Sequence, residues 1–274
     1  MRNYKLVASD LDGTLFNNQA EVSLENLSAI NTLWEKGVHF VPSSGRTLSE
    51  MRADIKDNPQ VRYIIYSNGA GVYDKETGEQ ILTCLSNDVV KRILDVLHSM
   101  ETHITYRYNG KSFVDATCQT DEAYNYYNVC EEHRDAVRGY ANHVNNFKEL
   151  GYLADQVEVI SVFFRNNQDQ EACKQLFSKW EELRVVEGAP YNLEIVNKDA
   201  GKGNALRCLA DKLGIDYADT ISVGNSDNDE SMIQAAGLGL AVSNSCESLK
   251  AVADEIVCSN EEHVIDYVLK HYIL

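Results

Sequence analysis

Short apolar runs alternate with helical patterns near both ends of the chain. Predominantly apolar runs at 6–10, 38–43, 63–67 and 220–223 stop at polar or glycine-containing segments. Runs of this length and composition are typical of strands buried on both faces. The pattern therefore predicts four core strands.

Between and after these runs, apolar residues recur at helical spacing. Ser23 is placed to cap a helix whose apolar positions recur at helical spacing, and Gly214 is placed to end a second helix. The apolar positions of the two helices are Leu24, Leu27, Ile30 and Trp34, and Leu206, Leu209, Ala210 and Leu213. Strand-helix-strand repetition predicts an α/β fold with a parallel, doubly wound sheet of the Rossmann-like kind.

The middle of the chain has a different pattern. Asn109-Gly110 lies between strand candidates at 103–108 and 111–114 and predicts a hairpin. Further candidates are helices at 88–100, 120–146 and 170–183 and strands at 157–164, 184–186 and 193–196. This segment predicts an α+β domain at 84–193, inserted into a core domain formed by 1–83 and 194–274.

Composition and charge limit which binding partners and which cellular compartment suit the chain. The 274 residues carry a formal net charge of −17, which argues against nucleic acid or an anionic membrane as a partner. Seven cysteines without a CxxC pair favour a reducing compartment, and no run reaches the roughly 18–20 apolar residues that span a bilayer. We therefore expect a cytoplasmic protein, a monomer or small homo-oligomer.

Chemistry in such sheets gathers where the parallel strands end. The first strand runs into Asp10-Leu11-Asp12-Gly13-Thr14, where two carboxylates two residues apart point the same way if the strand geometry persists. Asp and Gly are also common where a strand simply passes into a turn. Taken alone, this motif leaves both interpretations open.

Three further loops carry complementary groups. Ser43-Ser44-Gly45-Arg46 offers a hydroxyl and backbone amides, Lys202 precedes a helix, and 224–229 is an acidic, amide-rich loop suited to a hard cation. Each has an ordinary structural interpretation as a cap, a solvated lysine or a turn. Together they supply an attacking oxygen, charge neutralisation and positioning, as phosphoryl transfer requires.

With these motifs in this order the sequence resembles the haloacid dehalogenase superfamily of phosphohydrolases. The resemblance covers essentially the whole chain, and Ser67-Asn68-Gly69-Ala70 extends it to the Cof-type branch with its class IIB cap. Independently, the long interval between Ser44 and Lys202 has room for an inserted domain.

The resemblance implies roles for individual residues. Asp10 would attack phosphorus to form an aspartyl-phosphate, and Asp12 would act as general acid and base. Phosphate contacts would come from Leu11, Ser44, Gly45, Lys202 and Asn228, and Mg²⁺ would bind Asp10, Asp12, Asn225 and Asp229. The substrate would be a small phosphorylated metabolite, with sugar phosphates favoured.

One position departs from the family pattern. The fourth motif usually begins Gly-Asp, whereas this chain has Asn225, so one negative charge is missing. We expect weaker metal binding, or a larger share for Asp229 and for Asp227. Two other functions remain open, a phosphosugar mutase and a non-catalytic phosphometabolite-binding regulator.

Overall fold

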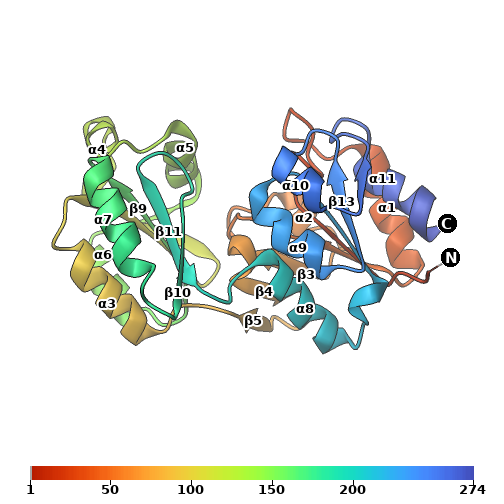
Figure 1. Cartoon of the computed structure of the whole chain (residues 1–274), viewed down its shortest axis with the longest axis horizontal. Helices are drawn as coiled ribbons and strands as arrows, with labels where there is room; N and C mark the ends of the chain where they lie inside the picture. The colour runs from red at the N-terminus through yellow and green to blue at the C-terminus, as the bar shows by residue number, and fades with distance from the viewer. Residues whose placement is uncertain (1) are drawn as a thin grey trace. The chain divides into compact units, whose positions relative to one another are not determined.

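The computed structural model describes residues 2–274, which divide into two compact units. The first unit comprises 1–45, 51–81 and 201–274, and the second comprises 46–50 and 82–200. The first is coloured red-orange and blue in Figure 1, and the second yellow to green. No helix within 2–274 is both long and apolar enough to cross a membrane.

The first unit is built on a parallel five-stranded sheet in the order β14-β13-β12-β1-β2. Its strands are β1 (Leu6–Ser9), β2 (His39–Pro42), β12 (Thr220–Gly224), β13 (Leu238–Val242) and β14 (Glu255–Val257). Its α-helices are α1 (Leu24–Glu35), α2 (Ala53–Lys56), α8 (Lys202–Leu213), α9 (Glu230–Ala235), α10 (Glu247–Val252) and α11 (Val264–Val268). It also has the short 3₁₀ helices η3 (Tyr217–Asp219) and η4 (Asp227–Asp229) and the π-helix η5 (Leu269–Ile273). The doubly wound α/β architecture expected from the sequence is confirmed.

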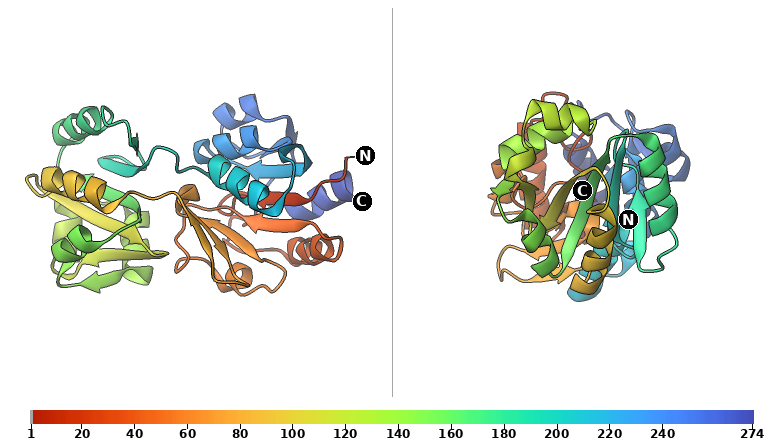
Figure 2. Two further views of the ribbon diagram at one scale, coloured as in Figure 1. Left: turned by 90° about the horizontal axis from the view of Figure 1, so that it is seen from below. Right: turned by 90° about the vertical axis from the view of Figure 1, so that its left-hand side faces the viewer.

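Helices cover both faces of this sheet (Figures 1 and 2). Leu6 and Ala8 of β1 pack in one apolar cluster with Leu206 and Leu209 of α8. Val7, on the opposite face by strand alternation, is also fully buried. Burial on both faces explains why these strands are continuous apolar runs rather than alternating ones.

The expected helix caps are present. The Ser23 side chain accepts a hydrogen bond from the Asn26 N–H at 3.1 Å, and Gly214 ends α8 with a left-handed φ of 65°.

The apolar run at 63–67 behaves differently from the prediction. It forms β3 (Tyr63–Tyr66), which pairs antiparallel with β4 (Gly71–Asp74) in a separate sheet that β5 (Gln80–Leu82) completes. A parallel bridge, Ser43 to Ile65, joins β3 to the end of β2.

The second unit contains a six-stranded sheet in the order β10-β11-β9-β6-β7-β8. Its strands are β6 (Thr102–Tyr108), β7 (Lys111–Asp115), β8 (Asn142–Val144), β9 (Val157–Phe164), β10 (Leu183–Val186) and β11 (Asn192–Asn197). Its helices are α3 (Asn87–Leu97), α4 (Asp121–Tyr126), α5 (Glu131–Tyr140), α6 (Phe147–Leu153) and α7 (Asn167–Phe177), with the turn η2 (Ala116–Cys118). It has the α+β character expected of the inserted domain.

Several local predictions in this unit can be compared with the structure. Asn109 and Gly110 both have positive φ, 51° and 69°, and join β6 to β7 as the predicted hairpin. The predicted helix over 120–146 is wrong as a single element: the chain breaks at Asn128, whose φ is 55°, and residues 142–144 form β8 beside β7. β11 pairs with β9 and β10, so the second unit continues past the expected boundary at 193 to Ala200.

Candidate active site

Three strands of the first unit end at the same level of the sheet. Ser9, the last residue of β1, lies opposite Val223 of β12 and Pro42 of β2. The Asp10 N–H donates to the Val223 carbonyl at 2.9 Å, and the Ser43 N–H donates to the Ser9 carbonyl at 2.8 Å. Since the register is continuous, the loops that begin at these ends lie at one edge, as predicted.

Lys202 lies at the centre of this edge and contacts two carboxylates. Its Nζ is 2.6 Å from Asp10 Oδ1 and 2.6 Å from Asp229 Oδ1. The side chains of Lys202 and Asp229 are fully buried, and that of Asp10 is 7% exposed. Lys202 opens α8, which carries it from the other half of the chain to the nucleophile candidate.

Burial and charge shift the protonation equilibria of this cluster. Burial raises the pKa of Asp10 to about 6, with Lys202 opposing the rise and Asp229 adding to it. Burial alone lowers the pKa of Lys202, but the two carboxylates outweigh it and raise the pKa above its ordinary value. The ammonium therefore remains charged, and one negative charge is left over in the cluster.

Both carboxylate oxygens of Asp229 accept hydrogen bonds from other groups of the protein. Its Oδ2 accepts from the backbone N–H groups of Asn225 at 2.9 Å and Ser226 at 3.1 Å, while Oδ1 accepts from Lys202. The Ser226 side chain completes a capping box with Asp229 at the start of η4. Both oxygens of Asp229 are thus engaged in holding the lysine and the loop.

Asn225 packs against the turn that follows Asp10. Its Oδ1 lies 3.3 Å from the Thr14 hydroxyl, which donates to it. Gly13 has a φ of 79°, and a Cβ there would lie 2.4 Å from Asn225 Nδ2, so the close approach requires glycine. Asp12, in the same turn, is exposed to solvent. The turn thus presents the Asp12 carboxylate outward and brings the Asn225 amide against its backbone.

The groups at this edge suit a hard cation. Oxygen donors are available from the Asp10 carboxylate, the Asp12 backbone carbonyl and the Asn225 amide, and the uncompensated negative charge favours a cation. Within 2–274, no three His, Cys, Asp or Glu side chains are grouped as a metal site. The residues therefore fit Mg²⁺ only if amide and backbone oxygens complete the set.

A second cluster joins the β2 loop to the loop after β12. The Ser44 N–H donates to the Ile65 carbonyl, and the Asn68 N–H donates to the Ser44 carbonyl, each at 3.0 Å. Asn228 Nδ2 in turn donates to Asn68 Oδ1 at 3.0 Å. A Cβ at Gly45 would lie 3.1 Å from that same oxygen. Three of the predicted phosphate-binding positions, Ser44, Gly45 and Asn228, thus meet at Asn68.

Sequence reasoning assigned Asn68 no role at the site. It lies in η1 (Ser67–Gly69) with a φ of 53°, a conformation that asparagine tolerates better than most residues. The sequence signal for this position is the segment Ser67-Asn68-Gly69-Ala70, which follows the third apolar run. The remaining predicted residue, Leu11, is fully buried, and its carbonyl accepts from the N–H groups of Thr14 and Phe16.

Comparisons with known proteins agree with this geometry. The haloacid dehalogenase-like hydrolase family matches residues 7–269. Phosphatase YwpJ of Bacillus subtilis is 30% identical, with 98% of this chain and all of that protein aligned. The 5-amino-6-(5-phospho-D-ribitylamino)uracil phosphatase YcsE of the same organism is 27% identical over 98% of this chain and 96% of its own length.

Solved structures include one of comparable length. The crystal structure of TM0651 from Thermotoga maritima superposes with a TM-score of 0.81 at 26% identity, covering 97% of each chain. The match spans nearly the whole chain, so the fold is shared over almost its full length. The chain therefore belongs to the haloacid dehalogenase-like hydrolases, and within them it is a phosphatase of the Cof type.

Proposed function

We propose that this phosphatase hydrolyses the monoester of a small phosphorylated metabolite in a magnesium-dependent reaction through an aspartyl-phosphate. The observation that carries the proposal is the buried contact of Lys202 with both Asp10 and Asp229. A lysine held at a buried carboxylate keeps positive charge where a phosphoryl group would arrive. An ion pair that only stabilised the fold would not have to lie at the carboxyl ends of the parallel strands.

In the first step, a carboxylate oxygen of Asp10 attacks phosphorus and the ester oxygen leaves. Asp12, which is exposed two residues after Asp10, gives that oxygen its proton. In the second step, Asp12 takes a proton from water as the water oxygen attacks phosphorus, and the Asp10 carboxylate is released. Lys202 neutralises charge on the phosphoryl oxygens in both steps.

Mg²⁺ would be held by the Asp10 carboxylate, the Asp12 carbonyl and Asn225, and it would shield the attacking carboxylate from the negative phosphate. This differs from the expectation that Asp229 gains a larger share of the metal, because both Asp229 oxygens hold other partners. Ser44, Gly45 and Asn228 would contact the phosphoryl group from the side of Asn68.

For the substrate we favour a phosphorylated sugar or sugar alcohol. The relatives YcsE, YwtE and YitU are named for a substrate with a phosphorylated ribityl chain, and they are 26–28% identical to this chain. The proposal takes from these names only the class of phosphorylated polyol. The inserted domain would select among such substrates.

A screen of sugar and polyol phosphates for inorganic phosphate release tests this function. Release should require Mg²⁺ and should vanish in Asp10→Asn, whereas Asp88→Asn, which changes an exposed carboxylate in the second unit, should retain it. Product isomers without phosphate release would instead indicate a mutase. Full activity in Asp10→Asn would refute the nucleophile.

A further inference from the structure

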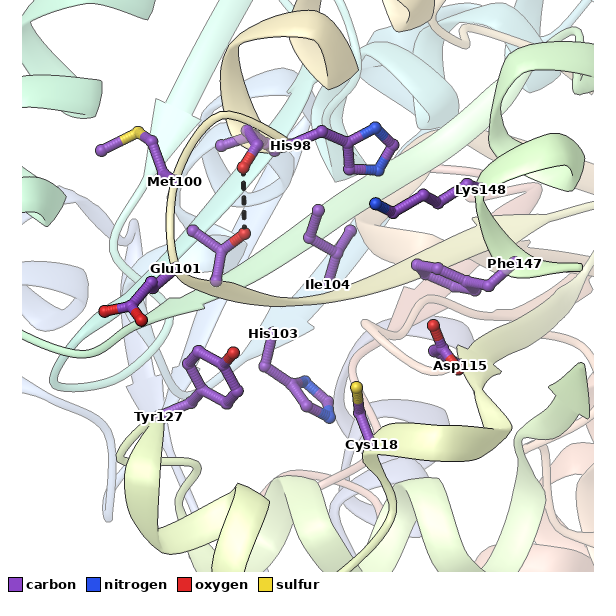
Figure 3. A pocket seen from close by; sticks show the side chains of 12 residues that line it. His98, Met100, Glu101, His103, Ile104, Asp115, Cys118, Tyr127, Phe147 and Lys148 are labelled. Carbon is purple, nitrogen blue, oxygen red and sulfur yellow. Dashed lines mark hydrogen bonds between the residues drawn. The ribbon is translucent and has the colours of Figure 1, made fainter. Parts of the chain in front are cut away.

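A cavity of about 230 Å³ lies in the second unit, apart from the residues assigned to catalysis. We call it the sheet-edge pocket and define it by His98, His103, Ile104, Asp115, Phe147 and Lys148, which line it (Figure 3). Its volume is below that of sites for drug-sized molecules and suits a small metabolite.

The pocket arises from unequal strand lengths. β6 pairs with β9 from Thr102 onward, but its ladder with β7 begins only at Thr105, opposite Val114. After Asp115 the chain leaves the sheet through η2. On the side of β7, residues 102–104 of β6 therefore have no neighbouring strand among the described residues, and the pocket occupies that position.

His103 is a polar group without a partner in the wall of this pocket. It is 3% exposed, and neither ring nitrogen has a hydrogen-bond partner among the described residues. Burial lowers the pKa of His103 to about 4, so at neutral pH the ring carries one donor and one acceptor nitrogen. Leaving such groups unpaired in a buried position is costly, and an occupant that pairs with them would recover that cost.

Two charged groups of opposite sign also line the pocket, the exposed Lys148 and the partly buried Asp115. Lys148 forms no ion pair or hydrogen bond with the residues described, and Figure 3 shows its side chain reaching in above Phe147. Asp115 uses Oδ1 to accept from the Thr117 N–H and hydroxyl, which leaves Oδ2 outside these contacts. Glu101 differs from both, because Arg165 and Tyr126 already bind its carboxylate.

We propose that the sheet-edge pocket binds a free apolar α-amino acid. Its carboxylate would contact the Lys148 ammonium, its ammonium would contact Asp115 and the acceptor nitrogen of His103, and its side chain would lie against Ile104 and Phe147. An anion alone would pair with Lys148 but not with Asp115, and a cation alone would pair with Asp115 but not with Lys148. A zwitterion with an apolar side chain satisfies all of these groups.

Access to His103 requires one small movement. The ring nitrogens are covered from water, and Figure 3 shows the Cys118 thiol beside the ring. Cys118 is only partly buried, in the turn after β7, and a cysteine side chain can change rotamer at small cost. Binding should therefore change the environment of the imidazole as well as that of the charged groups.

Saturation-transfer NMR on the full chain tests the proposal with three matched probes. L-Leucine carries both charges, L-leucinamide lacks the carboxylate, and 4-methylpentanoate lacks the ammonium. L-Leucine should bind with a Kd in roughly the micromolar to millimolar range. Its binding should shift the imidazole signals of His103.

Two variants should separate the two ends of the ligand. Lys148→Met should weaken binding of L-leucine and 4-methylpentanoate about fivefold and leave L-leucinamide unchanged. Asp115→Asn, which can still cap η2, should weaken L-leucine and L-leucinamide and leave 4-methylpentanoate unchanged. Lys179→Met, a change at another exposed lysine of this unit without a partner among the described residues, should alter none of them.

Two results would overturn the proposal. One is the absence of saturable L-leucine binding at about 10 mM, a concentration above the expected Kd range. The other is binding that neither Lys148→Met nor Asp115→Asn weakens, or that leaves the His103 signals unmoved. Circular dichroism of each variant confirms that the comparison is between folded proteins.

Discussion

Replacing Lys202 with methionine tests how much the stability of the buried cluster depends on the lysine charge. Methionine preserves much of the apolar chain but removes the ammonium that contacts Asp10 and Asp229 at 2.6 Å each. Removing one partner of a buried ion pair costs about 3–5 kcal/mol, because the remaining charge is left uncompensated. At 2–4 °C per kcal/mol, the corresponding fall in Tm is roughly 6–20 °C.

The two tryptophans allow the loss of stability to be assigned to one of the two units. Trp34 lies in α1 of the first unit and Trp180 lies in the second, so a Trp180→Phe background leaves Trp34 as the fluorescent reporter of the unit that contains Lys202. Urea unfolding is followed with EDTA present, so that no divalent cation replaces the lost ammonium. Lys212→Met is the matched control, because Lys212 pairs with Glu79 at the surface and should cost at most about 1 kcal/mol.

A double variant provides the internal check. Lys202→Met combined with Asp229→Asn leaves one buried carboxylate of the pair, so part of the stability should return. The coupling between the two positions measures their interaction directly. A loss in Lys202→Met no larger than that in Lys212→Met, or no recovery in the double variant, would refute the electrostatic account.

Three further predictions concern the metal, the phosphate loops and the second unit. Asn225→Asp should lower the Mg²⁺ concentration for half-maximal phosphate release about tenfold by restoring a carboxylate beside the Asp10 turn, and an unchanged requirement would contradict this role. Asn68→Gly, which keeps the left-handed backbone but removes the hydrogen bond to Asn228, should lower kcat/KM about three- to tenfold in steady-state kinetics without changing the circular dichroism spectrum, whereas unaltered kinetics would exclude a positioning role. Because burial holds the pKa of His103 at about 4 in the folded state, its contribution to stability is present above the unfolded value of about 6.5 and is lost as the pH falls from there to about 4. His103 should account for about 3 kcal/mol of the loss in urea unfolding followed by Trp180, and His103→Phe should reduce the slope of this part of the pH profile by that share, while the share of His133, whose pKa burial lowers to about 3, remains.

Elements that are specified by residues close together in the sequence were predicted well. β9 has the predicted bounds, 157–164, because eight consecutive buried residues leave no ambiguity about a strand within a sheet. The Asn109-Gly110 hairpin and the Ser23 cap likewise depend on residues within a few positions of one another. The break at Asn128 was missed because polar helical spacing on both sides of it hides a single left-handed residue.

Pairing partners and supporting contacts depend on residues distant in sequence. The run at 63–67 is as apolar as a central strand, yet β3 takes its main partner from the neighbouring β4. Asn68 acquires its place at the site only because Ser44 and Asn228, from two other loops, meet it there. The segment around each residue does not by itself name the partners that these contacts bring together.

The sequence by itself determined the residue types of the catalytic edge, since Asp10, Lys202 and the 224–229 loop follow strands or begin a helix whose apolar patterns are unmistakable. Tertiary structure decided what each group does there. Asp229, a predicted metal ligand, also accepts hydrogen bonds from Lys202 and from two backbone N–H groups, contacts that its own segment does not reveal, and its binding of metal stays a prediction. A sequence pattern specifies which ligands are available at a strand end, whereas the competition among them for hydrogen bonds is settled only when distant loops are brought within a few ångströms.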